Sequence, residues 1–362
     1  MQITTLKLLN FRNYDQLEIS FSKKCNIIYG KNGMGKTNLI EAIYILSLTK
    51  SFRDGNDKIL IKDEKNLAKI SGNVIDNIEN NYQVIINDLG KKVKINNNLC
   101  QKISDYISKI NVILFNPDDL KFIKDTPSVR RKYLNVDISE FDNSYLICLS
   151  NYNKLIKQRN SYLKTMYFNG NASKEYLNIL TDKIIDYGIE IHNKRLNFIN
   201  LINKYLNYFY KKITNNCNLN LEYVSDFDNL NKEDIKKKYE NTLEKDMLFG
   251  KTQFGIHHDD LIFKMNNKLI KEFGSEGQQK NAIIAYKLAE IQIYKEVKNK
   301  FPILILDDLF SELDNEKINN ILNLLDENVQ TFITTTSIDK VSDEIIKNSK
   351  LIKVEDGKIV EV

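Results

Sequence analysis

One glycine-rich run near the start of the chain has the residue types and spacing of a phosphate-binding loop. It matches the pattern G-x-x-x-x-G-K-[S/T] and consists of Gly30, Lys31, Asn32, Gly33, Met34, Gly35, Lys36 and Thr37. The glycines let backbone N–H groups turn inward and line a concave anion site. Lys36 can reach the β- and γ-phosphates of a nucleoside triphosphate, and the Thr37 hydroxyl can ligate Mg²⁺. Asn38 follows directly and is counted with the loop.

Two aspartates near the other end of the chain are a second candidate for chemistry. Asp307 and Asp308 follow the apolar run Ile303–Leu306. A buried parallel strand presents a carboxylate at its carboxyl edge, where a phosphate loop also lies. There Asp307 can bind Mg²⁺ through water, and Asp308 can orient or deprotonate an attacking water. The plain alternative is that the pair caps a helix.

A third motif opens a helix and contains Ser275, Gly277 and Gln278. A serine hydroxyl and free N–H groups at a helix N-terminus form another anion site. The alternative is a capping box, in which Ser275 is the N-cap and Gln278 stands three residues later. Both interpretations can be true together. A further motif follows the aspartate pair: Ser311-Glu312-Leu313-Asp314. The simplest interpretation of this run is a second helix cap.

The elements around these motifs are predicted from hydrophobic periodicity. The apolar run Cys25–Tyr29 predicts a buried strand before the loop, and apolar residues at helical spacing predict a helix from Lys36. Other strands are predicted at 1–8, 17–21, 67–74, 82–87, 92–95, 111–115, 303–306 and 331–334. Hairpins are predicted at 260–273, around Asn266-Asn267, and at 351–362, around Asp356-Gly357; helices are predicted at 278–298 and 317–325.

The middle of the chain, from about 128 to 250, has a different pattern. Apolar residues recur there at helical spacing, with sparse glycine and no proline after Pro127. We see no sustained a/d heptads, which a free coiled coil needs. We therefore predict a lobe of packed helices and not an extended arm.

Size and composition limit the architecture. The chain has 362 residues, more than the roughly 250–300 at which a single core stops growing. Two lobes are expected: residues 1–113 and 298–362 form an ATPase lobe, and 114–297 form a largely helical lobe that carries the Ser275 motif. Hydrophobic residues make up 42% and charged residues 28%, which is ordinary for a soluble protein. No membrane span and no signal peptide are recognised, so a cytoplasmic protein is expected.

Other residue classes carry little information on function. The four cysteines are scattered without metal-ligand spacing, and three histidines do not suggest a histidine-based metal site. The net charge of +5 is weak evidence for nucleic acid, because a solvated lysine-rich surface explains it equally well.

The order of the motifs is that of an ABC-type ATPase, and the chain resembles the RecF proteins of bacterial recombinational repair, relatives of SMC and Rad50. The resemblance covers nearly the whole length. Besides the ATPase motifs, it rests on the segments 9–14 (LNFRNY), 50–53 (KSFR), 115–120 (FNPDDL), 127–131 (PSVRR) and 254–261 (FGIHHDDL).

The chain departs from the family pattern at a few positions. The family commonly has Pro and Arg where this chain has Ile256 and His258, and it usually has Gly near Asp125. Because a neutral histidine carries no charge, His258 is not expected to be a constant contact for phosphate. Thr335 and Thr336 stand after the last core strand, where ABC transporters place a histidine.

The resemblance implies an α/β fold, an ABC-type P-loop ATPase head (a mixed sheet with helices) with an inserted helical lobe. It implies a homodimeric clamp in which ATP lies between the P-loop of one subunit and Ser275 and Gly277 of the other. Lys36 and Thr37 would bind phosphates and Mg²⁺, Asp307 would hold the metal through water, and Asp308 would support slow hydrolysis. Arg12 would lie near the phosphates.

The resemblance also implies partners. These are duplex DNA next to single-strand gaps, the RecO and RecR mediators, and RecA loading downstream, in DNA repair and replication-fork maintenance. The candidate basic residues are Arg53, Arg130, Arg131 and Lys132, each of which is explained equally by surface solvation. Two alternatives stay open: a transporter ATPase subunit, and a structural clamp with negligible hydrolysis.

Overall fold

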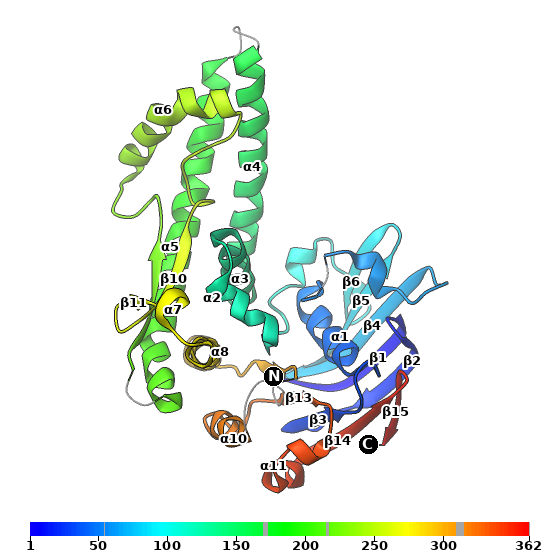
Figure 1. Ribbon diagram of the computed structural model, residues 1–362. Helices are drawn as coiled ribbons and strands as arrows, with labels where there is room; N and C mark the ends of the chain where they lie inside the picture. Colours follow the sequence, from blue (N-terminus) through cyan, green and yellow to red (C-terminus); the bar gives the residue numbers. More distant parts are fainter. Residues whose placement is uncertain (54, 169–172, 215–216, 309–314, 362) are drawn as a thin grey trace. The chain divides into compact units, whose positions relative to one another are not determined.

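The computed structural model describes residues 1–53, 55–168, 173–214, 217–308 and 315–361 (Figure 1). The chain divides into two compact units. Unit 1 comprises Met1–Leu120, Tyr208–Asn216 and Lys280–Val362, and unit 2 comprises Lys121–Asn207 and Cys217–Gln279. The sequence predicted boundaries at 113/114 and 297/298. The first lies seven residues before the end of the Met1–Leu120 segment, and the second lies at the end of the long helix that begins at Glu276, most of which counts with unit 1.

Unit 1 contains an antiparallel sheet of six strands in the order β2-β1-β4-β5-β6-β7. The strands are β1 (Gln2–Phe11), β2 (Tyr14–Ser20), β4 (Leu67–Asp76), β5 (Ile78–Asn87), β6 (Gly90–Ile95) and β7 (Asn98–Leu99). Apolar residues alternate along β1 and β2, so that one face of this sheet packs into the core.

A second six-stranded sheet of unit 1 has the order β15-β14-β3-β13-β12-β8. Its strands are β3 (Cys25–Tyr29), β8 (Val112–Phe115), β12 (Ile303–Leu306), β13 (Thr331–Thr335), β14 (Ser349–Glu355) and β15 (Lys358–Glu361). All pairings are parallel except that of β14 with β15. The strands β3, β13, β12 and β8 therefore end at one edge, which is where ligands bind in open parallel sheets.

Helix α1 (Lys36–Leu48) lies in the core that both sheets share. One cluster of buried side chains joins Leu39, Ile43 and Leu46 of α1 to both sheets, for example to Leu6 and Ile305. Ten of its thirteen residues are buried. The helix is therefore buried nearly all round, as expected for a helix between two layers.

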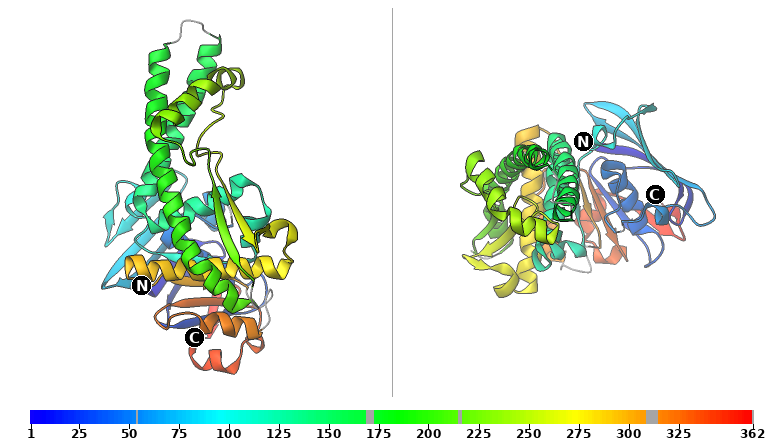
Figure 2. Two further views of the ribbon diagram at one scale, coloured as in Figure 1. Left: turned by 90° about the vertical axis from the view of Figure 1, so that its left-hand side faces the viewer. Right: turned by 90° about the horizontal axis from the view of Figure 1, so that it is seen from above.

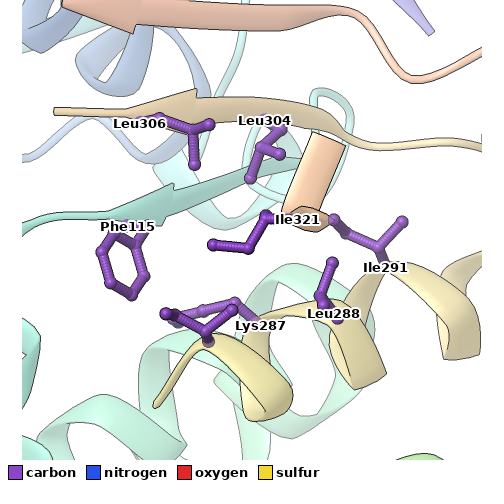
Figure 3. Close-up of a pocket in the computed structure, with 8 residues that line it drawn as sticks. Phe115, Lys287, Leu288, Ile291, Leu304, Leu306 and Ile321 are labelled. Atoms are coloured by element: carbon purple, nitrogen blue, oxygen red, sulfur yellow. The ribbon is translucent and has the colours of Figure 1, made fainter. Parts of the chain in front are cut away.

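The opposite face of the second sheet is covered by α8 (Glu276–Lys298) and α10 (Asn315–Asn323). Figure 3 shows Phe115, Leu304 and Leu306 of the sheet facing side chains of these two helices. A cavity of about 20 Å³ remains between them. Strand residues thus alternate between this face and the α1 face.

Unit 2 is built on a long antiparallel helix pair, α4 (Asn143–Phe168) and α5 (Lys174–Ile213), as Figures 1 and 2 show. Arg195 Nε donates to Tyr145 Oη at 2.9 Å, and Arg159 Nε donates to Thr181 Oγ1 at 3.1 Å, which fixes the pairing of the two helices. Arg159 also binds Asp246 of α6 (Lys232–Phe249) at 2.7 Å. The predicted packed helical lobe is thus a helix pair with α6 bound across it.

The remaining helices and strands complete the two units. They are α2 (Lys121–Lys124), α3 (Pro127–Phe141), α7 (Ile270–Phe273), α11 (Asp343–Lys347), β9 (Leu219–Val224), β10 (Asp260–Met265), β11 (Lys268–Leu269), η1 (Asp57–Leu60), η2 (Ile103–Asp105), η3 (Pro117–Leu120) and η4 (Ile338–Lys340). Among the described residues, no helix is both long enough and apolar enough to cross a membrane.

Two predictions of secondary structure in unit 2 are wrong. The first is the prediction that all of 128–250 is helical, because residues 219–224 form strand β9, whose side chains alternate between buried and more exposed and which pairs with β10. The second strand of the predicted hairpin at 260–273 ends at Leu269, after which α7 begins. The Gly274 N–H donates to Ile270 O at 2.9 Å, so a helical turn replaces the ladder there.

Candidate nucleotide-binding site

The glycine-rich loop connects β3 to α1 at the carboxyl edge of the parallel sheet. Gly33 has φ of 82°, and a Cβ atom added there meets no atom within 4 Å. Its backbone conformation therefore needs glycine, while the space beside it is open to a ligand. Gly30 also requires glycine, but for a steric reason: an added Cβ would lie 2.3 Å from Val354 O.

The loop itself holds the side chain of Lys36. Its Nζ donates to Gly30 O at 2.6 Å and to Lys31 O at 2.9 Å, and the residue is only 8% exposed. Burial lowers the pKa of Lys36, against the opposite effect of Asp308 and Asp307. The ammonium is thus held within the loop where a triphosphate would be bound.

Asp307 meets Thr37 at the same edge. Asp307 Oδ1 lies 3.5 Å from Thr37 Oγ1 and accepts a hydrogen bond from Thr334 Oγ1 at 2.7 Å. Burial raises the pKa of Asp307, which is 7% exposed. A hydroxyl and a carboxylate are hard oxygen ligands, so this donor set fits Mg²⁺. The parallel register brings together residues that are 270 positions apart in the sequence.

Asp308 has a left-handed backbone, with φ of 50°. Its N–H donates to Thr334 Oγ1 at 2.8 Å, so one threonine binds both aspartates. Asp and Asn tolerate this conformation better than most residues. The residues that follow, including the Ser311–Asp314 motif, lie outside the described part of the chain.

Arg12 is bound to the P-loop helix by an ion pair. It stands in the tight turn between β1 and β2, and its guanidinium makes two bonds to Glu41, of 2.9 and 2.8 Å. Glu41 is fully buried on α1. Arg53 Nη1 lies 3.9 Å from the same carboxylate. The sequence interpretation missed Glu41, although an acidic residue among apolar positions of a helix was the available signal.

Asparagine side chains connect this turn to the loop. Asn38 Nδ2 donates to Asn13 Oδ1 at 2.8 Å, and Asn13 Nδ2 donates to Met34 O at 3.3 Å. The Tyr14 hydroxyl donates to Gly35 O at 3.1 Å. Asn38 and Met34 thus take part in shaping the loop, while Lys31, Asn32 and Gly33 lie exposed at its surface.

Asn116 is a second residue that sequence reasoning missed. It follows β8, whose Phe115 O accepts the N–H of Asp307 at 2.9 Å. Alternation along the strands directs Asn116 and Asp307 to the α1 face, because Leu114 and Ile305 belong to the α1 core. Its buried Oδ1 has no hydrogen-bond partner within the described part of the chain. A polar residue directly after an apolar strand was the available signal.

Ser275, Gly277 and Gln278 stand at the start of α8. Ser275 N donates to Gln278 Oε1 at 2.8 Å, and Gln278 N donates to Ser275 Oγ at 3.3 Å. The capping-box interpretation is therefore confirmed. These residues belong to unit 2, whereas Lys36, Thr37 and Asp307 belong to unit 1.

The candidate basic residues differ in their surroundings. Arg130 is 9% exposed and makes two bonds of 2.6 Å to Asp260, so surface solvation is the wrong explanation for this residue. Arg131 Nη1 donates to Asp259 O at 2.6 Å. The side chain of Arg53 is 44% exposed, and Lys132 is exposed as well.

The ion pair of Glu41 gives a first prediction. Glu41→Gln should lower the free energy of unfolding by about 3 kcal/mol, because Arg12 then loses its charge partner in a buried setting. Urea unfolding followed by circular dichroism measures this. The control is Glu18→Gln, in an exposed pair with Lys7, which should change stability by less than about 1 kcal/mol. Equal effects of the two substitutions would contradict the prediction.

Comparisons with known proteins identify the family of the chain. The family model of the RecF/RecN/SMC N terminal domain matches residues 2–360. The DNA replication and repair protein RecF of Oenococcus oeni is 39% identical, covering 99% of this chain and 100% of that protein. The protein of the same name from Bacillus velezensis is 37% identical, covering 99% of this chain and 100% of that protein.

Solved structures give the same result. A structure of the recombination mediator protein RecF with ATP, in the RecFOR pathway, matches with a TM-score of 0.92 and 31% identity, covering 99% of this chain and 97% of that chain. An Smc head bound to the C-winged helix domain of ScpA matches with a TM-score of 0.57 at 18% identity, covering 100% and 98%, and so shows the fold alone. The chain therefore belongs to the RecF family, within the RecF/RecN/SMC group, and has the fold of an ABC-type ATPase head.

Proposed function

We propose that this protein is an ATP-dependent DNA clamp of recombinational repair and replication-fork maintenance, with a weak ATPase that controls its dimerisation. The observation that carries the proposal is the meeting of Thr37 and Asp307 beside Lys36, at the carboxyl edge of one parallel sheet. The name of the relatives, DNA replication and repair protein, supports the role in repair.

The roles of the site residues follow from their chemistry. Lys36 and the loop N–H groups bind the phosphates of ATP, and Thr37 and Asp307 are the residues that would hold Mg²⁺, in part through water. Bound there, Mg²⁺ would neutralise charge on the phosphates. Asp308 orients or deprotonates the attacking water, and Asn116 offers a further oxygen for that water. An aspartate in the Asp308 position suits slow turnover.

The second half of the site comes from another copy of the chain. A Cβ added at Gly277 meets only Ser275 Oγ, at 4.0 Å. Among the residues that the structure describes, nothing thus requires glycine there, and glycine in a helix costs about 1 kcal/mol relative to alanine. We infer that Gly277 allows the close approach of the ATP bound to a partner subunit, beside the Ser275 hydroxyl. ATP that contacts both subunits then favours the closed homodimer, and hydrolysis removes that bridge.

The proposed substrate is double-stranded DNA next to a single-strand gap, where the dimer acts with RecO and RecR and supports RecA loading. The RecFOR pathway named for the similar solved structure supports these partners. Contacts to the DNA backbone predict binding that is independent of sequence and weakens steeply with salt. Arg53 and Lys132 are the more accessible candidates for such contacts.

Single-turnover ATP hydrolysis, with and without gapped DNA, tests the function. We expect slow hydrolysis that DNA stimulates, and a footprint at the gap that requires ATP. Tight membrane association without DNA stimulation would instead favour the transporter subunit, and binding without any hydrolysis would favour the structural clamp.

A substitution in the Ser275 motif tests the dimer. Ser275→Ala should leave ATP binding by the monomer unchanged within about twofold but weaken the ATP-dependent dimer by about tenfold, because it removes one bond to a charged phosphate. Sedimentation velocity with and without ATP measures the dimer. Ser104→Ala, at a partly exposed position, is the control. Loss of ATP binding by the monomer would show that Ser275 does not act across the dimer.

A further inference from the structure

Strand β13 lies between the two strands that lead into the nucleotide site. On one side it pairs with β3, which continues into the P-loop, and on the other side it pairs with β12, which continues into Asp307 and Asp308. The strand is buried along its whole length. Its carboxyl end therefore stands in the middle of the edge at which ligands bind in open parallel sheets.

Thr334 is a polar residue at this end of β13. Phe332 belongs to the α1 core, so alternation along the strand directs Thr334 to the same face, to which Asp307 is also directed. Thr334 is only 1% exposed. A hydroxyl that is buried this deeply is expected to have hydrogen-bond partners, and here both partners belong to the candidate site.

The Thr334 hydroxyl is used twice. It donates to Asp307 Oδ1 at 2.7 Å and accepts the Asp308 N–H at 2.8 Å. Thr37 Oγ1 lies 3.5 Å from the same carboxylate oxygen. Within the described part of the chain, the hydrogen bonds of the Asp307 carboxylate thus all go to Oδ1, and Oδ2 stays available for a water molecule on the metal.

Asp308 depends on the same hydroxyl for its backbone conformation. Its φ of 50° lies in the left-handed region, which is less favourable for residues that have a Cβ atom. The bond from the Asp308 N–H to Thr334 offsets this cost and fixes the direction in which the chain leaves β12. Because the side chain follows the backbone, Thr334 also determines where the second carboxylate stands.

We propose that Thr334 is a positioning residue for ATP hydrolysis, which sets the place of both carboxylates through one hydroxyl. The inference rests on the proposed function, in which Asp307 serves the metal and Asp308 the attacking water. Thr334 acts through these two residues and not through a contact with ATP. Hydrogen bonds that orient metal ligands in this way contribute about 10–100-fold to metal affinity or activity.

An apolar residue would meet a purely structural need at this position. Valine has nearly the shape of threonine, suits a central strand and buries no hydroxyl. Thr331 shows the contrast at the amino end of the same strand, because it is also buried, at 4% exposed, but its hydroxyl reaches only Val329 O, at 3.4 Å. Thr331 is therefore a matched control for Thr334.

Thr334→Val tests the inference by ATP binding as well as by activity. Isothermal titration measures the Kd for ATP with Mg²⁺ and again with EDTA. The Kd with Mg²⁺ should rise by about tenfold and the Kd with EDTA by less than about twofold, because only binding with the metal uses Asp307. Single-turnover hydrolysis at saturating ATP should fall by about tenfold or more. Thr331→Val should change none of these readouts.

Two further variants separate the hydroxyl from the shape of the side chain. Thr334→Ser keeps the hydroxyl and should stay close to the unchanged protein in binding and hydrolysis. Thr334→Ala removes the hydroxyl without adding a methyl group beside the carboxylate, so it should behave as Thr334→Val does. Circular dichroism at the assay temperature measures whether each variant is folded.

Three results would overturn the inference. These are unchanged hydrolysis in Thr334→Val, an impairment of Thr334→Ser equal to that of Thr334→Val, and an equal loss of ATP affinity with Mg²⁺ and with EDTA, which would mean that the substitution only disturbs the fold. A failure of the proposed function is distinguishable from these. If the unchanged protein bound ATP equally with Mg²⁺ and with EDTA, the metal role of Asp307 would be wrong, and this inference would fall with it.

Discussion

Lys36→Ala is expected to abolish ATP binding, with an increase in Kd of more than about a hundredfold. The ammonium makes two hydrogen bonds within the loop, to Gly30 O and Lys31 O. Alanine removes these bonds together with the charge that faces the phosphates, and bonds to charged groups contribute about 1.5–3 kcal/mol each. Because ATP bridges the two subunits in the proposed clamp, the ATP-dependent dimer should disappear as well.

Isothermal titration with ATP and Mg²⁺ measures the affinity, and sedimentation measures the dimer. Lys24→Ala is the matched control. It also removes one lysine charge, but Lys24 stands just before β3, at the opposite end of that strand from the loop, and its side chain is largely exposed. It should leave both readouts unchanged. An ATP-dependent dimer that persists in Lys36→Ala would contradict the assignment of the loop.

Asp307→Asn is expected to reduce ATP hydrolysis by about a hundredfold or more, because the site loses the carboxylate that would hold Mg²⁺ beside the developing charge. The same substitution should raise the Tm of the protein without nucleotide. Burial raises the pKa of Asp307, so at pH 7 folding keeps an ionised carboxylate in a place that favours the neutral form. Removing that charge removes the penalty. This penalty is present above the folded-state pKa and disappears as the pH falls below the ordinary pKa of aspartate.

The two effects of Asp307→Asn have separate measurements. Single-turnover hydrolysis measures the loss of activity. Thermal unfolding at pH 7 and near pH 4 measures the increase in Tm, which should be smaller at the lower pH. Asp339→Asn, at an exposed position, is the control. A fall in Tm at pH 7 would mean that the bond from Thr334 outweighs the burial of the charge.

The sequence predicted the elements that carry chemistry better than those that support them. The strands Cys25–Tyr29 and Ile303–Leu306 have the predicted bounds, because continuous apolar runs ended by Gly30 and Asp307 leave little choice. Strand β9 was missed because a six-residue alternation is a weak signal inside a long helical segment. The sequence predicted one boundary at the end of the helix α8, whereas the chain divides inside that helix, after Gln279, because α8 continues as one periodic helix across the two units.

The pairing of side chains across the fold was not available from the sequence. Glu41 was not singled out from the sequence, and the structure places Arg12 against it. Arg130 looked like a surface charge until Asp260 of β10 was found beside it. Both depend on partners that are 29 and 130 positions away, and helical periodicity reports only the face that a residue occupies.

The proposed ATP site is built from two copies of the chain, and a mixture of two impaired variants tests this most directly. Lys36→Ala retains Ser275 and Gly277, and Ser275→Ala retains the P-loop. Mixed dimers therefore contain one intact composite site. At protein concentrations high enough for the mixed dimer to form, ATP hydrolysis by a 1:1 mixture should rise clearly above the average of the two separate variants, because each mixed dimer has one good site. Activity that stays at the level of the separate variants would show that Ser275 does not complete the site of a partner subunit.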